Sequence, residues 1–184
     1  SLLTSVYFRM GQIEKMTETG EKALAVTPND VQVLSILAQT LPRVLSKDPA
    51  VAAKQLEQSE VYARRAIDLL PTLPKPENAT EESFAAARNG ALAMAHSGLG
   101  LVLLHRQKFS EAVPELEQSV KLDPEPDPVN YYLLGFADEK TLHYDDAAAA
   151  FAKCAAIQGQ LQAKCQSGAQ EAKRLALTQP SAPK

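Results

Sequence analysis

Hydrophobic residues recur with the spacing of amphipathic helices along most of the chain, most clearly between residues 93 and 159. Apolar and small residues there lie three and four positions apart, so they fall on one side of a helix. One stripe consists of Phe109, Ala112, Val113, Leu116, Ser119 and Val120, and another of Tyr144, Ala147, Ala148, Phe151, Cys154 and Ala155. Because such a stripe has to be buried, the pattern predicts helices packed against one another.

The same segment repeats itself with a shift of 35 residues. Seven positions of its first half return in the second half, in the same order and at the same spacing. They are His96, Leu99, Gly100, Phe109, Ala112, Leu116 and Ser119, which correspond to Tyr131, Leu134, Gly135, Tyr144, Ala147, Phe151 and Cys154. A repeat of this length predicts a helix pair that is used more than once.

The repeated residues resemble the tetratricopeptide repeat, a helix-turn-helix unit of about 34 residues. The resemblance rests on Leu99-Gly100, Ala112, Leu116 and Pro124, followed by Leu134-Gly135, Ala147 and Phe151. The sequence departs from the family where His96 and Tyr131 take the place of the usual Trp, and where Gly159 replaces the closing Pro. The resemblance implies an all-α fold, a right-handed superhelical array of antiparallel helix pairs with a C-terminal capping helix.

We expect a single domain over residues 1–177. Its units span about 1–28, 29–71, 80–125 and 126–159, and are followed by a capping helix at 160–177 and a disordered tail at 178–184. The first unit lacks the start of its first helix, which suggests a fragment of a longer array or a frayed end. The second unit is divergent, because about nine residues are inserted between Ala38 and Ser59 relative to the clear repeats.

Local signals place several helix boundaries. Asp30, Asp48 and Thr80 each precede a helical pattern and carry a side-chain oxygen suited to an N-cap. The helix after Thr80 is expected to continue to about Arg106. The proline-containing stretch 71–79 predicts an extended connector.

The amino-acid composition favours helices and argues against nucleic-acid binding and a membrane span. Aromatic residues make up only 5% of the chain and Trp is absent, which favours closely packed helices over sheets. The formal charge of -3 lacks the basic excess of a nucleic-acid-binding surface. No run of about 18 apolar residues exists, so no membrane span is predicted.

The two cysteines, Cys154 and Cys165, flank the predicted turn at Gly159. Two antiparallel helices joined there would place them opposite each other, and small neighbours could allow the approach that a disulfide needs. Two interpretations stay open: a disulfide in an exported, periplasmic protein, or two buried thiols. The spacing fits neither a redox motif nor a zinc site.

The sequence offers no candidate for catalysis, and we expect neither an enzyme nor a cofactor. His96, His105 and His143 lack the spacing of a helical metal site. Gly98 and Gly100 are interpreted as packing residues, because they lie inside a helical pattern and not after a strand.

The resemblance places the first helix of each unit along a concave groove. The residues expected there as a partner-binding surface are Met94, Leu101, Leu104 and His105 from one unit, and Val129, Tyr132, Leu133 and Phe136 from the next. The Lys, Asn and Arg that hold a peptide carboxylate in co-chaperone members of the family are missing at the matching positions. We therefore predict a non-enzymatic scaffold that binds an apolar or amphipathic segment of a protein or peptide partner.

Two alternatives to this prediction remain. The same groove could serve self-association, which would make the protein an assembly module. The same residues could also be covered by the long helix after Thr80 or by the divergent unit, in which case they would belong to the core.

Overall fold

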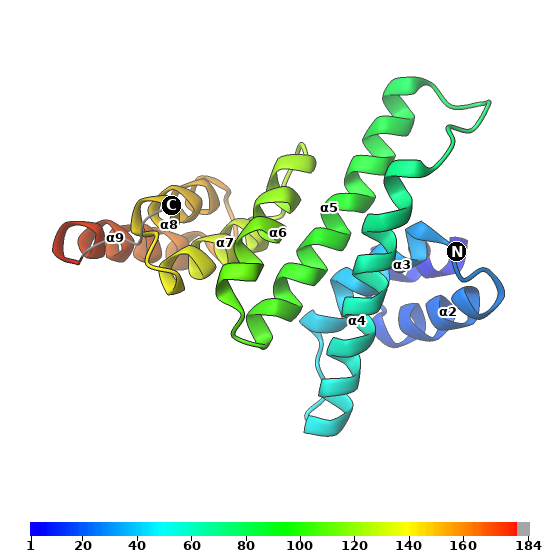
Figure 1. Cartoon of the computed structure of the whole chain (residues 1–184), viewed down its shortest axis with the longest axis horizontal. Coiled ribbons are helices and arrows are strands. Elements are labelled where there is room, and N and C mark those ends of the chain that lie inside the picture. Colours follow the sequence, from blue (N-terminus) through cyan, green and yellow to red (C-terminus); the bar gives the residue numbers. More distant parts are fainter. Residues whose placement is uncertain (180–184) are drawn as a thin grey trace. The chain divides into compact units, whose positions relative to one another are not determined.

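The computed structural model describes residues 1–179. Within these residues the chain forms nine α-helices and two short 3-10 turns, and no strand (Figure 1). The prediction of an all-α fold is therefore confirmed. The chain divides into two compact units, Ser1–Val102 and a second that begins at Leu103, so the boundary falls inside one helix.

The first unit contains four complete helices and most of a fifth. They are α1 (Leu2–Arg9), α2 (Ile13–Val26), α3 (Val31–Thr40), α4 (Pro49–Leu69) and α5 (Glu81–His105), with 3-10 turns η1 (Leu41–Arg43) and η2 (Leu70–Thr72). Helix α2 packs on α1 and α3, and α4 packs on α3. Helix α3 is accordingly the most enclosed, and seven of its ten residues are buried.

Side-chain caps begin the helices of this unit where the sequence places them. The Asp30 carboxylate accepts a hydrogen bond of 3.1 Å from the Val33 amide, and Asp48 accepts one of 2.8 Å from the Ala50 amide. Thr80 Oγ1 accepts one of 3.1 Å from the amide of Ser83. Each bond satisfies an N–H that the first helical turn leaves without a partner.

The link between α3 and α4 is irregular because of its prolines. Pro42 has no amide hydrogen to donate, and α3 gives way there to η1. Helix α4 then begins at Pro49, so η1 and residues 44–48 contain most of the predicted insertion. The predicted connector at 71–79 is partly wrong, since residues up to Thr72 still form the turn η2 and the non-helical stretch begins at Leu73.

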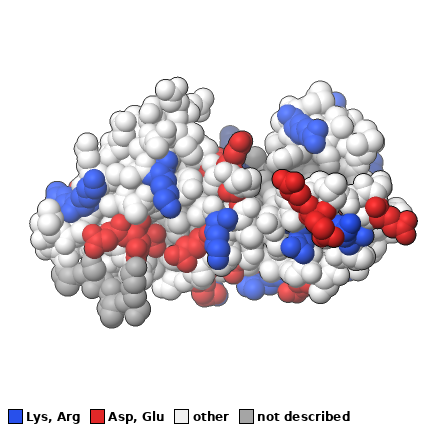
Figure 2. All heavy atoms as spheres, turned by 90° about the horizontal axis from the view of Figure 1, so that it is seen from above, with Lys and Arg blue, Asp and Glu red and all other residues white. Residues whose placement is uncertain are grey.

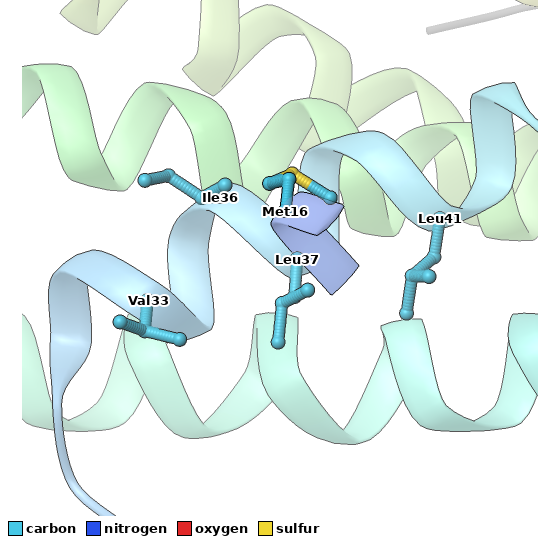
Figure 3. Close-up of a cluster of buried hydrophobic side chains, with 5 residues drawn as sticks. All are labelled: Met16, Val33, Ile36, Leu37 and Leu41. Atoms are coloured by element: carbon cyan, nitrogen blue, oxygen red, sulfur yellow. The ribbon is translucent and has the colours of Figure 1, made fainter. Parts of the chain in front are cut away.

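Two apolar clusters form the core of the first unit. The first contains Met16, Val33, Ile36, Leu37 and Leu41 (Figure 3). The second contains Leu34, Ala66, Leu70, Ala91 and Ala95. Helix α5 contributes alanines to the second cluster, so its long apolar sequence serves as core in this unit.

Helix α5 also approaches the end of α3 closely at Gly98. A β-carbon on Gly98 would overlap the carbonyl group of Ala38 and lie 2.9 Å from the amide nitrogen of Gln39. The position therefore has no room for any side chain, which supports the interpretation of Gly98 as a packing residue.

The second unit contains the last residues of α5 and four further helices. They are α6 (Phe109–Leu122), α7 (Pro128–Lys140), α8 (Tyr144–Ala156) and α9 (Gln162–Thr178). Each packs on the next along the chain, and α9 also touches α7. Their apolar core consists of Ala147, Ala148, Phe151, Ala169 and Ala172.

A helix is present where the capping helix is predicted. It buries Cys165, Ala169 and Ala172 against α8, and its polar residues on the opposite side are exposed. A disordered tail is predicted for residues 178–184, and residues 180–184 of it lie outside the described part of the chain. Of its first two residues, Thr178 ends α9 and Gln179 accepts a hydrogen bond of 2.8 Å from the Tyr144 hydroxyl.

Three of the turns between helices share one backbone conformation. Gly11, Gln107 and Leu142 have positive φ angles of 66°, 58° and 65°. In each turn this residue donates its amide to a carbonyl three residues earlier, and the next residue donates to a carbonyl five residues earlier. This is the Schellman arrangement that closes helices. Two of the turns lie 35 residues apart, which matches the sequence repeat.

We expect replacement of Leu142 with glycine to stabilise the second unit. Leucine is strained in the left-handed region, whereas glycine is not, and we expect a gain of about 0.5–1 kcal/mol in the free energy of unfolding. Urea denaturation followed by circular dichroism measures it. Leu142→Ala is the matched control, because alanine shortens the side chain but keeps the β-carbon; equal stability of the two variants would contradict the prediction.

Candidate functional site

Two aromatic residues on one side of α7 are the clearest feature of the predicted binding surface. Tyr132 and Phe136 are one helical turn apart, half-buried, and packed against the core of the second unit. The Tyr132 ring lies 5.8 Å from that of Phe151, and the Phe136 ring lies 6.0 Å from that of Phe109 in an edge-to-face arrangement. These contacts fix both rings while leaving part of each accessible to solvent.

Lysine side chains lie over these rings. The Lys164 ammonium of α9 is 4.4 Å from the centroid of Tyr132, and that of Lys140 is 5.3 Å from the centroid of Phe136. Both lysine residues are exposed to solvent. The surface thus combines aromatic area with positive charge, because each ammonium is attracted to the electron-rich face of a ring.

The eight predicted groove residues do not all belong to one unit. Met94 and Leu101 lie in the first unit and the other six in the second. Met94 packs against the cluster that contains Met16 and Leu37, so it takes part in the core of its unit.

The other residues differ in their exposure. Leu104 is only 8% exposed, and His105, the last residue of α5, is exposed. Val129, Tyr132, Leu133 and Phe136 are all half-buried on α7. Within the second unit the structure therefore brings together an α7 surface of these four residues.

A polar depression of about 500 Å³ lies between two turns of the second unit. It is lined by Gln107, Lys108, Phe109, Ser110, Glu111, Lys140, Thr141 and His143. Lys108 pairs with Glu111 at 3.0 Å, and Nδ1 of His143 lies 2.9 Å from the Thr141 hydroxyl. The depression therefore contains one ion pair and one contact between a hydroxyl and an imidazole.

Cys154 and Cys165 lie at disulfide distance, with sulfur atoms at bonding distance and Cα atoms 5.8 Å apart. The predicted placement of the pair on opposite helices is confirmed, since Cys154 belongs to α8 and Cys165 to α9. The pair joins the two helices on either side of Gly159.

Charged side chains of both signs are interspersed on the face shown in Figure 2. Among residues 1–179, no group of three or more His, Cys, Asp or Glu side chains is placed to hold a metal ion. In the same part of the chain, no helix has the length and apolarity needed to cross a membrane.

Sequence reasoning found the α7 aromatic residues but missed two features. One is the lysines over the rings, since Lys164 comes from a different helix. The other is a groove in the first unit between α2 and α4.

No protein-family model and no curated protein sequence matches this chain.

Proposed function

We propose that this protein is a non-enzymatic interaction scaffold of the tetratricopeptide type, which binds an apolar or amphipathic segment of a partner protein through the first helices of its repeats. The observation that carries the proposal is the α7 surface, where Tyr132 and Phe136 remain half exposed although both touch the core. Aromatic residues held in place in this way lose little conformational freedom on binding, so they are effective anchors for a partner.

The repeated turns support the assignment to a helical repeat. The turns at Gln107 and Leu142 have the same hydrogen-bond pattern and lie at the spacing of the sequence repeat. Gly135 occupies the Leu-Gly position, where a β-carbon would lie 2.8 Å from the ring of Phe151. Close helix contact through a small residue is the physical role of that position in the family.

The test uses peptides selected for binding to the full chain from a random phage-displayed library. We expect the selected peptides to be rich in apolar residues and to lose at least about tenfold in affinity for Phe136→Glu, because a buried charge opposes an apolar contact. Fluorescence anisotropy with labelled peptides measures the affinity. Leu133→Gln serves as a milder second variant, since Phe136 also touches the core.

The control is Leu177→Glu, at a position on α9 that is 90% exposed and lies outside the predicted surface. Circular dichroism verifies that each variant keeps its helices. Unchanged peptide affinity in folded Phe136→Glu and Leu133→Gln would refute the proposal. Self-association through the same surface is the second hypothesis, and a mass that rises with protein concentration and falls in Phe136→Glu would favour it.

A further inference from the structure

A groove runs along the first unit between α2 and α4. It consists of two overlapping depressions of about 540 and 560 Å³ that share Thr17, Glu21, Leu41 and Gln55. From α2 the other lining residues are Ile13, Glu14 and Glu18; from the α3–α4 link, Val44; and from α4, Val51, Lys54, Gln58 and Tyr62. All of these residues belong to one compact unit.

The irregular link after α3 explains why this groove has an apolar floor. Helix α3 ends at Thr40, and α4 starts only at Pro49. Leu41 begins the turn η1 between them, and Val44 follows that turn. Val44 is 40% exposed and Val51 is 48% exposed, so apolar surface remains open to solvent at this point. An accessible apolar groove of this kind is typical of a site that another element covers.

The α2 side of the groove is acidic. Glu14, Glu18 and Glu21 are three and four residues apart, so they lie on one side of α2, and all three are exposed. Glu18 pairs with Lys22 at 2.5 Å, while no ion pair engages Glu14 or Glu21 within residues 1–179. Burial and the negative charge of Glu21 raise the pKa of Tyr62. Lys54 is the one cation among the lining residues, and it lies on the α4 side.

We propose that this groove binds an amphipathic helix of a partner protein that carries apolar residues on one side and Lys or Arg along an edge. The apolar side would cover Val44 and Val51, and the basic edge would face Glu14 and Glu21. The distance from Ile13 to Glu21 along α2 is about 12 Å, since a helix rises 1.5 Å per residue, so two to three turns of the partner fill the groove. The proposal concerns the first unit alone and is independent of the α7 surface.

The experiment uses the full chain and a synthetic 14-residue helical peptide with leucine on one side and lysine along both edges. A second peptide has glutamate in place of every lysine. We expect the lysine peptide to bind, measured by fluorescence anisotropy at about 0.1 M salt, and the glutamate peptide to bind at least tenfold more weakly. Glu14→Lys combined with Glu21→Lys should weaken binding of the lysine peptide by about tenfold or more.

Two matched controls separate the groove from general attraction. Glu57→Lys combined with Glu82→Lys changes the net charge equally at exposed positions outside the groove, and should leave affinity within about twofold. Val51→Gln should weaken binding, whereas Val61→Gln, also exposed on α4 but outside the lining, should not. Three outcomes would overturn the proposal. They are an equal loss of affinity in the groove and control variants, equal binding of both peptides, and no binding of the lysine peptide.

Discussion

Replacing Phe151 with alanine is expected to lower the free energy of unfolding of the second unit by about 3–5 kcal/mol. Its ring is 3% exposed and fills the space between two glycines of neighbouring helices. A β-carbon would lie 2.8 Å from the ring at Gly135 of α7, and 3.0 Å from it at Gly168 of α9. Removing the ring thus leaves a cavity between three helices, which closely packed backbones cannot close fully.

A double-mutant cycle in urea denaturation tests the origin of this effect. Gly135→Ala alone should lower the free energy of unfolding of the second unit by about 1–3 kcal/mol, because the Phe151 ring has no free space into which to move. On the Phe151→Ala background the same change should be neutral or stabilising by up to about 1 kcal/mol, since alanine favours a helix and the clash is gone. Additive effects of the two substitutions would show that the ring and the glycine do not share this space.

The second large effect is expected for Gly98→Ala, which should destabilise the first unit by about 2–4 kcal/mol. The added methyl group meets main-chain atoms of Ala38 and Gln39 and not the end of a flexible side chain. Helix α5 would have to move away from α3, and the contacts of Ala91 and Ala95 with Leu34 and Ala66 would loosen. Thermal or urea denaturation with full-length protein measures the change.

Gly90 provides the control for this substitution in the same helix. A β-carbon there would meet no atom within 4 Å. Gly90→Ala should therefore stabilise the protein by about 0.5–1 kcal/mol, the ordinary helix preference of alanine over glycine. If both substitutions changed stability in the same direction, close contact at Gly98 could not be the reason.

Much of the helical architecture is predictable from local sequence. The caps at Asp30, Asp48 and Thr80, the turn at Gly11 and the interruption at Pro42 all follow from the chemistry of single residues. These effects act within a few residues and need no knowledge of distant parts of the chain. Local chemistry therefore suffices to place these caps, this turn and this interruption.

The turn at Leu142 shows where local preference stops being informative. Leucine avoids positive φ, so nothing in the residue itself predicts a left-handed conformation there. Tyr144 and Ala147 of α8 are buried just after the turn, and Ala137 just before it. Leu142 adopts this strained conformation because the packing of α7 and α8 fixes where the turn between them must occur.

The candidate sites were predictable only in part. The sequence indicated which side of α7 carries Tyr132 and Phe136, because helical periodicity assigns residues to a side. It did not indicate that Lys164 covers the Tyr132 ring or that α2 and α4 leave a groove with an acidic edge. Those features join residues far apart in the sequence, and they depend on how helices are spaced and rotated.

By itself, the sequence determined that this chain is helical, where most helices begin, and which residues of each helix are apolar. Capping, proline geometry and the 3.6-residue period are local properties, so they can be read from neighbouring residues. The tertiary structure decided that Cys154 and Cys165 lie at disulfide distance, that Met94 packs in a core, and that apolar surface stays open beside Glu14 and Glu21. These outcomes depend on contacts between separate helices, whose distances are set by the fit of side chains such as Phe151 against glycine.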